Sequence, residues 1–334
     1  MDMFNTLVDL VSAFGPSGSE KGVSAAIEKV ARQYCDEVVH DVMGNLICHK
    51  KGSGPKVMFA AHMDSIGLVA THIDDKGFVH VGAIGGINPQ VILYSQVRFA
   101  NGTAGLVCAD GSADPSKLKI SDLCIDIGAS SREEAERLVR VGDVAVYNTR
   151  TVEAGNRMIS PYMDNRVSCL VLLMAMEKLN RSENDLYFVF TTQEEVGLRG
   201  AKTSAWTVDP DYAIAVDVTI SDDQPGSKHL ASSVFGGGAA VKVMDSSVIC
   251  HPQVVNHLIK LAEEKGIKAQ RDVIRSGGTD VGAIHMTRGG VYAGGISIPC
   301  RYIHTPVEMV DKSDVKACAE LVAAFAESKL EKEC

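Results

Sequence analysis

The sequence predicts an α/β fold with a mixed, largely parallel sheet that is flanked by helices and interrupted by an inserted antiparallel β module. Two observations support this prediction. Apolar runs that suit fully buried strands alternate with helical patterns in the first and last parts of the chain. Between them, residues 67–157 contain short alternating segments separated by turn sequences. At 334 residues, one large domain with a smaller one is the expected arrangement.

The N-terminal part begins with an amphipathic helix that is expected to end near Phe14. Ser17 and Glu20 have the spacing of a capping box, which predicts a second helix that continues to about Tyr34. Strands then follow, separated by turns that are rich in glycine. They are expected at residues 37–42, 46–50 and 57–61.

The middle part is expected to contain the β module and one short helix that begins at Ser131. Its clearest predicted strands are residues 78–81, 91–99, 104–108 and 144–147. The α/β pattern returns after Pro161. There we expect helices at 165–180, 251–265 and 313–330 and strands at 186–191, 212–217 and 291–298. The predicted division is therefore 1–66 with 158–334 for the α/β domain and 67–157 for the insertion.

Composition narrows the class of protein. A formal net charge of −9 and the lack of a dense Lys/Arg cluster argue against a nucleic-acid partner. Nine scattered cysteines without a C-x-x-C pair are typical of reduced thiols in a cytosol. The first residues carry an acid where a secretory signal carries basic residues, and no apolar run reaches the roughly 20 residues that span a membrane. We expect a cytoplasmic protein without a membrane partner.

Two adjacent acids, Glu194 and Glu195, follow the apolar run in the segment LYFVFTTQEEVG. In open α/β sheets, ligands bind just outside the carboxyl ends of the strands. A metal ion would relieve the repulsion between the two acids, because one carboxylate can bind the cation while the other stays free as a base. The plainer interpretation is a solvated turn, since Glu is mostly exposed.

Similar side chains stand where other predicted elements begin or end. They are His62 and Asp64 after strand 57–61, Asp217 at the end of strand 212–217, His304 after strand 291–298 and Asp164 at the start of helix 165–180. In a mainly parallel sheet these positions share one edge. Taken singly, each has an ordinary explanation, such as a polar turn for His62 and Asp64 or a helix N-cap for Asp164. Taken together, they indicate a site.

The donor set indicates metal binding. Two histidines with several carboxylates suit Zn²⁺, Co²⁺ or Mn²⁺ better than Ca²⁺ or Mg²⁺, which prefer oxygen ligands alone. Five protein ligands exceed the three that one catalytic zinc usually has, whereas a pair of ions that share a carboxylate uses that number. The spacing of His62 and Asp64 fits an imidazole whose second nitrogen is held by a carboxylate.

Six segments in the same order resemble the M42 family of dinuclear-metal aminopeptidases, which includes the glutamyl, deblocking and tetrahedral enzymes. They are AAHMDSIG (60–67), SPYMDNR (160–166), TTQEEVG (191–197), AVDVT (215–219), SGGTDVG (276–282) and RYIHTPVEMV (301–310). The resemblance covers nearly the whole chain. One position departs from it: Ser65 stands where the family commonly has a glutamate after the aspartate.

The resemblance implies two divalent metal ions per subunit, with Asp164 as the bridging ligand. His62 and Asp217 would complete one site, and Glu195 and His304 the other. Glu194 would be the general base that activates a water bridging the ions, and Asp64 would orient His62 as a further catalytic residue. The implied fold is a dinuclear zinc peptidase-like domain with an inserted β-barrel-like domain used for dimerisation. The implied substrates are short peptides cleaved at the N-terminal residue, and homodimers would assemble into a dodecamer.

Two other functions fit the same residues. An N-acyl amino acid deacylase could use the same two-metal site on a different amide. A binding scaffold that retains a metal shell is a second alternative, although a scaffold needs no free base such as Glu194. The preferred N-terminal residue is not determined by the sequence. Arg271, Arg275 or Arg301 in the pocket would favour an acidic residue, and an apolar pocket is equally compatible.

Overall fold

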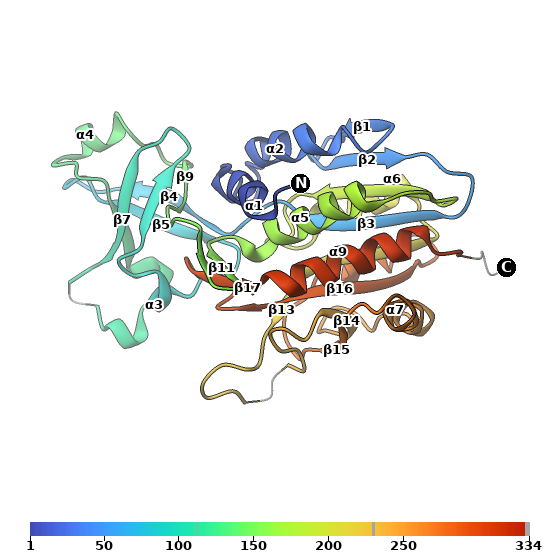
Figure 1. The fold of residues 1–334 in the computed structure, drawn as a ribbon. Coiled ribbons are helices and arrows are strands. Elements are labelled where there is room, and N and C mark those ends of the chain that lie inside the picture. Colours follow the sequence, from blue (N-terminus) through green and yellow to red (C-terminus); the bar gives the residue numbers. More distant parts are fainter. Residues whose placement is uncertain (112, 229–230, 331–334) are drawn as a thin grey trace.

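The computed structural model describes residues 1–111, 113–228 and 231–330. Its strands form one sheet of 11 strands and, at the left of Figure 1, a separate closed barrel of six strands. The large sheet is mixed and is flanked by helices. The predicted fold class, a mixed α/β sheet with an inserted barrel, is therefore confirmed.

Four parallel strands form the centre of the large sheet. In spatial order they are β12 (Asp185–Thr191), β3 (Lys56–His62), β13 (Tyr212–Ile220) and β16 (Tyr292–Arg301). These strands read as nearly continuous apolar runs because helices cover both of their faces. The register pairs Thr191 with His62, so the carboxyl ends of neighbouring strands lie level at one edge of the sheet.

Antiparallel strands extend the sheet on both sides. Beyond β12 lie β2 (Leu46–Lys50) and β1 (Glu37–His40). Beyond β16 lie β17 (Glu308–Asp311), β11 (Arg157–Ser160) and β10 (Val152–Ala154), while β14 (Ala239–Met244) pairs with β16 and carries β15 (Ala269–Val273). Parallel pairing thus occurs in the centre, where the strand ends converge, and between β14 and β15.

Helices pack on both faces of the sheet. On the near face in Figure 1 lie α1 (Met3–Ser12), α2 (Lys21–Ala31), α5 (Met163–Lys178), α7 (Pro252–Lys265) and α9 (Lys312–Glu327). On the other face α6 (Arg199–Val208) packs on β12 and β3, and α8 (Val281–Ile284) packs on β13 and β16. The fully buried Arg166 joins α5 to α1, because its guanidinium donates to the carbonyl oxygens of Leu10, Ala13 and Gly15.

The barrel has its own hydrophobic cluster. Its strands are β4 (Gly67–Ile73), β5 (Val79–Ile84), β6 (Gln96–Phe99), β7 (Ala104–Ala109), β8 (Leu123–Asp126) and β9 (Val144–Tyr147). Two short helices, α3 (Pro89–Ile92) and α4 (Arg132–Glu136), and two 3₁₀ turns, η1 (Pro115–Lys117) and η2 (Ile120–Asp122), connect them. All six barrel strands lie within the predicted insertion, whereas β10 and β11 belong to the large sheet. The exact division at residues 66 and 158 stays a prediction.

Two local predictions are wrong. Residues 91–99 were expected to form one strand, but α3 occupies the first part because Asn88 accepts from the amide of Gln90 and Pro89 fits the first helical turn. The capping box is also absent, and the Ser17 hydroxyl instead donates to Asp64 at 2.6 Å. The helix α2 ends at Ala31, before the predicted end near Tyr34. The Asp64 carboxylate is a strong acceptor for the Ser17 hydroxyl because it is charged, and α2 has Glu20 at its N-cap position in place of Ser17.

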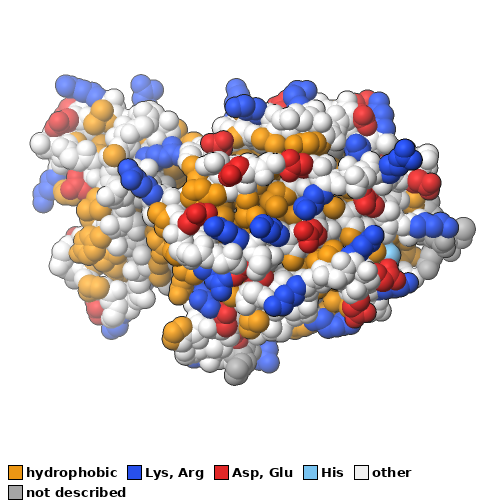
Figure 2. All heavy atoms as spheres, viewed as in Figure 1, with side chains coloured by type: hydrophobic (Ala, Val, Ile, Leu, Met, Phe, Trp, Pro, Cys, Tyr) orange, Lys and Arg blue, Asp and Glu red, His pale blue; other side chains and the backbone are white. Residues whose placement is uncertain are grey.

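Charged side chains of both signs are interspersed over the face shown in Figure 2. A waist separates the barrel lobe from the larger sheet lobe in the same view. Among the helices of the described residues, none has the length and apolar character needed to cross a membrane.

Candidate metal centre

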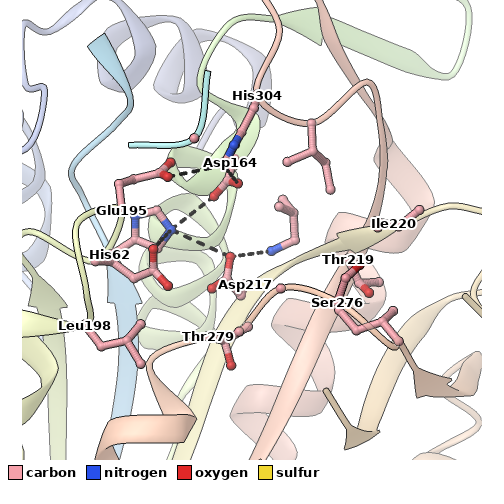
Figure 3. A pocket seen from close by; sticks show the side chains of 17 residues that line it. His62, Asp164, Glu195, Leu198, Asp217, Thr219, Ile220, Ser276, Thr279 and His304 are labelled. Carbon is pink, nitrogen blue, oxygen red and sulfur yellow. Dashed lines mark hydrogen bonds and ion pairs between the residues drawn. The ribbon is translucent and has the colours of Figure 1, made fainter. Parts of the chain in front are cut away.

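The carboxyl ends of the central strands bring the predicted ligands together. Two groups of side chains have ligand atoms that all lie within 4.8 Å of one another. The first group is His62, Asp164 and Asp217, and the second is Asp164, Glu195 and His304. Figure 3 shows these five side chains converging on one side of a pocket. Residues that are far apart in the sequence thus meet at the edge that the parallel strands define.

His62, at the end of β3, is the centre of the first group. Its Nε2 lies 3.1 Å from Asp164 Oδ1 and 3.8 Å from Asp217 Oδ1. Asp217 lies within β13, and its Oδ1 accepts from the amide of Val218 at 2.8 Å. Both side chains are nearly inaccessible to solvent. Such a buried pair of carboxylates around one imidazole needs positive charge nearby.

His304 is the centre of the second group. Its Nε2 lies 3.3 Å from Asp164 Oδ2 and 3.2 Å from Glu195 Oε2. Asp164 therefore presents one oxygen to His62 and the other to His304. This arrangement is the one that a carboxylate shared by two ions requires.

Asp64 holds several parts of the centre in place. Its carboxylate accepts from the hydroxyl of Ser17 and from the backbone amides of Glu194 at 3.0 Å and Glu195 at 3.2 Å. One oxygen also lies 3.4 Å from Nδ1 of His62. These contacts turn Nε2 of His62 toward Asp164 and fix the loop that carries both glutamates. Asp64 is fully buried, so it acts through these neighbours.

Glu194 belongs to neither ligand group. Its Oε2 lies 3.8 Å from His62 Nε2, its side chain is 11% exposed, and it lines the same pocket. Burial raises the pKa of Glu194 well above its usual value, against the opposing effect of His62, and Asp217 raises it further. A carboxylate at this place is available to take up a proton.

The electrostatics of the centre fit bound cations. Burial raises the pKa of Asp217 well above its usual value and also raises the pKa of Glu195. Burial alone would lower the pKa of His62, but the carboxylates of Glu194 and Asp164 raise it well above its usual value. In the described part of the chain, Asp164 Oδ1 and Glu195 Oε1 are buried without a hydrogen-bond donor. The donors and unpaired oxygens together fit divalent metal ions.

The backbone around the ligands is strained. Tyr162, Gln193 and His304 have φ values of 61°, 54° and 64°, a left-handed region that side chains other than glycine rarely adopt. The peptide bond between Asp164 and Asn165 is cis. Left-handed residues of this kind concentrate at functional sites, where the surrounding structure holds them in place.

Two buried acids of the centre were not assigned from the sequence. Glu308 accepts from the backbone amide of Asp164 at 2.9 Å and from that of His304 at 2.7 Å. It therefore positions one carboxylate and one imidazole of the candidate centre. Asp280 accepts from the hydroxyl of Thr191, and burial raises its pKa to about 6. Both residues lie in segments that carry the resemblance, and this was the available signal.

Ser65 and the three arginines lie outside the pocket lining. Ser65 is buried, and its hydroxyl is 3.4 Å from the carbonyl oxygen of Gly15. Arg301 pairs with Asp223 through two contacts of 2.9 and 2.8 Å. Arg271 and Arg275 are exposed. The absent glutamate at position 65 therefore leaves the ligand groups unchanged.

The pocket beside the ligands has a volume of about 630 Å³. Beyond the ligands it is lined by Leu198, Ile220, Ile274 and Ile303 together with small residues from the segment 276–279. Figure 3 shows Ile220, Thr219 and Ser276 across the pocket from Glu195. The pocket thus has an ionic wall and an apolar wall.

Known proteins are similar to this chain over nearly their full length. The chain is 46% identical over 322 residues to an aminopeptidase of Acetivibrio thermocellus, covering 96% of this chain and 97% of that protein. It is 35% identical to the lysyl aminopeptidase of Pyrococcus furiosus, covering 95% of each. Among solved structures, the TET1 peptidase of Pyrococcus horikoshii matches with a TM-score of 0.88 and 30% identity, covering 97% of this chain and 99% of that chain. That peptidase assembles into a tetrahedron or a large octahedral shell.

The fold and the ligand groups at the sheet edge define a peptide hydrolase of the aminopeptidase class. The family model described as M42 glutamyl aminopeptidase matches residues 44–321. The chain therefore belongs to the M42 peptidase family, and the predicted resemblance is confirmed.

Proposed function

We propose that the chain is a dinuclear-metal aminopeptidase in which Glu194 is the general base. The observation that supports this most strongly is the position of Asp164, which is common to both ligand groups. Beside them, Glu194 lines the pocket with a carboxylate that is not needed as a ligand. A binding scaffold would have no use for such a group.

The residues divide into two ligand sets. Asp164 would be shared, His62 and Asp217 would complete one site, and Glu195 and His304 the other. Two divalent ions held there would lower the pKa of a water molecule and polarise the substrate carbonyl. The mixture of imidazole and carboxylate donors favours Zn²⁺ or Co²⁺, with Mn²⁺ also compatible.

Glu194 would move the proton in the reaction. It would accept the proton of the attacking water and deliver it to the leaving amine. Its environment suits both steps, because burial raises its affinity for the proton. Asp64 would position this base, since it holds the amides of Glu194 and Glu195 and faces Nδ1 of His62.

The proposed ions favour cleavage at an N-terminus. Held by ligands such as Asp164, Glu195 and Asp217, an ion would offer a coordination position to the free α-amino group of a peptide. A blocked amino group would lose this interaction. An N-acylated amino acid is therefore a poorer fit than a peptide with a free N-terminus.

The apolar wall indicates the class of N-terminal residue. The described lining contains no Lys or Arg to pair with an acidic side chain. Arg301, one of the three candidates from the sequence, is held by Asp223 and stacks on the ring of Phe235, with its guanidinium 4.2 Å from the ring centroid. The only acids in the described lining are the proposed ligands Asp164, Glu195 and Asp217 and the proposed base Glu194. Leu198, Ile220, Ile274 and Ile303 therefore favour a neutral aliphatic side chain such as leucine.

The test uses protein that is stripped and reloaded with Zn²⁺, Co²⁺ or Mn²⁺. It is assayed against a panel of aminoacyl-anilides and N-acetylated amino acids. We expect turnover of the anilides, highest for leucine. Hydrolysis of N-acetyl amino acids alone would replace the aminopeptidase proposal with the deacylase alternative. Turnover highest for glutamyl or lysyl anilides would keep the aminopeptidase and contradict only the aliphatic pocket.

Two neighbouring variants form a matched pair for the base. Glu194→Gln is expected to lower kcat by about 10²–10⁴-fold with metal content nearly intact. Glu195→Gln and His304→Ala are expected to lose metal as well as activity. Full activity in metal-loaded Glu194→Gln would disprove the role of Glu194 as the base. The ligand assignment would still be tested separately by the metal content of Glu195→Gln and His304→Ala.

The barrel would serve as a dimerisation domain, and dimers would build a dodecamer. The known shell of the Pyrococcus horikoshii peptidase supports this assembly. Light scattering of the purified protein tests it, with a stable monomer as the contrary result. The predicted cytoplasmic location stays a prediction.

A further inference from the structure

A second set of reactive side chains lies on the barrel, outside the metal centre. Strands β5, β8 and β7 are neighbours, and their register places His80 opposite Cys124 and Cys124 opposite Cys108. The adjacent residues Val79, Ile125 and Val107 are fully buried in the barrel core. Because successive side chains of a strand point to opposite faces, His80 and the two cysteines point away from that core.

The two thiols are in direct contact. Their Sγ atoms are 2.9 Å apart, and each cysteine is half-buried. The hydrogen bond between them lowers the pKa of Cys108 and raises that of Cys124. Cys108 is therefore the better nucleophile of the pair, and Cys124 is the proton donor.

A surface cavity gives small molecules access to these sulfur atoms. It has a volume of about 720 Å³, and both thiols line it together with His80, Asp74 and Asp126. His80 is held by Asp74, with Nε2 at 3.4 Å from Oδ2. Several other thiols of the chain, such as those of Cys169 and Cys318, are fully buried. The barrel pair thus combines contact between two thiols with an opening to solvent.

We propose that Cys108 and Cys124 form a redox-active dithiol that a peroxide converts reversibly into a disulfide. The Cys108 thiolate attacks a peroxide oxygen, which breaks the O–O bond, forms a sulfenic acid and, for hydrogen peroxide, releases water after protonation. The Cys124 sulfur then attacks the Cys108 sulfur, and the sulfenic oxygen leaves as a second water. Two thiols and one hydrogen peroxide give one disulfide and two waters. A dithiol reductant reverses the reaction by thiol–disulfide exchange.

The disulfide would join β7 to β8 across the segment 109–123. It would close a loop between neighbouring strands of the barrel while leaving the metal centre untouched. Oxidation is therefore expected to raise the thermal midpoint of the protein, since a cross-link lowers the entropy of the unfolded chain.

The test treats the Zn²⁺-loaded full chain with one equivalent of hydrogen peroxide and maps disulfides by mass spectrometry. We expect a peptide that links Cys108 to Cys124, loss of two titratable thiols, and recovery with dithiothreitol. Cys124→Ser should instead accumulate a sulfenic acid on Cys108 that dimedone traps. Cys108→Ser should show neither product.

Cys35 and Cys48 provide an internal control. They also hydrogen-bond to each other, but Cys48 is fully buried. Linkage of Cys35 to Cys48 in place of the barrel pair would overturn the proposal. So would peroxide-resistant thiols at Cys108 and Cys124 that bind Zn²⁺ with His80, a result that would make this cluster a metal site.

Discussion

The sheet edge and the outer face of the barrel both carry reactive side chains, but their geometry arises in different ways. At the sheet edge, the ends of parallel strands bring together side chains that are far apart in the sequence, such as His62 and His304, and most of the site is buried. On the barrel, antiparallel register places Cys108 beside Cys124, and the site is half-exposed. At the sheet edge, Asp164 Oδ1 and Glu195 Oε1 have no hydrogen-bond donor among the described residues, whereas the two thiols of the barrel hydrogen-bond to each other.

This difference teaches what each region depends on. The sheet edge concentrates buried acids whose pKa values are raised by burial, so we expect bound cations to stabilise their charged forms. Among the described residues of the barrel, 67–147, no polar or charged side chain is buried, so we expect the barrel to be stable without a bound ion. Substitutions that affect metal binding at the sheet edge or packing in the barrel, but not both, test this comparison.

The largest effect is expected from Asp164→Ala. Because both ligand groups contain Asp164, the variant should lose both ions and several kcal/mol of transition-state stabilisation, which is about a thousandfold or more in kcat. Metal analysis and anilide assays measure this. Asp75→Ala, which removes an acid whose side chain is 93% exposed on the barrel, is the control and should change neither. Retention of both ions in Asp164→Ala would contradict a shared ligand.

The next effect concerns the barrel core. Phe99→Ala removes a buried ring and should destabilise the protein by about 3–5 kcal/mol. Since Phe99 belongs to the barrel cluster, metal content at room temperature should stay the same. Calorimetry and metal analysis of Phe99→Ala and Phe59→Ala, its counterpart in the sheet core, make the comparison. Equal loss of metal in both variants would show that the two regions are not separate.

Gly86→Ala tests the junction between the regions. Gly86 follows barrel strand β5, and a Cβ atom there would lie 2.9 Å from Nδ1 of His304. The variant should displace His304 and weaken one ion by about 10–100-fold, as changes to residues that support a ligand commonly do. Competition with a chelator measures this affinity. Gly111→Ala, in the barrel region with open space around it and a φ outside the left-handed region, is a matched control for folding. Unchanged affinity in Gly86→Ala would show that the barrel does not constrain the site.

The smallest effect concerns an ion pair of the sheet domain that lies outside the ligand groups. Burial opposes ionisation of Asp223, but hydrogen bonds from Arg301 and Ser221 lower its pKa from 3.8 to about 2. The pair should therefore stabilise the fold by on the order of 1–2 kcal/mol above about pH 4, and this contribution should disappear as the pH falls toward 2. Thermal midpoints of the wild type and Asp223→Asn should converge over that range. A constant difference would exclude this ion pair as the cause.

The sequence predicted most of the fold and the ligand types for clear reasons. Continuous apolar runs identified the central strands, and the rule for parallel strand ends brought His62, Asp164, Glu195, Asp217 and His304 to one edge. Local signals were weaker. Asn88 and Pro89 begin a helix where an alternating pattern indicated a strand, and Ser17 binds Asp64 instead of capping α2. In each case a short-range pattern was compatible with two structures.

By itself, the sequence determined the fold class and the residue types of the site, because these depend on periodicity and on side chains that follow strands. It also indicated the family, because six ordered segments resemble that family's motifs. Only the tertiary structure decided which atoms meet. It placed Asp164 between two imidazoles, brought Glu308 to the amides of Asp164 and His304, paired Arg301 with Asp223 away from the pocket and brought two thiols into contact. The physical reason is that burial and hydrogen bonding depend on neighbours that are distant in the chain, and a local sequence pattern carries no information about their distances.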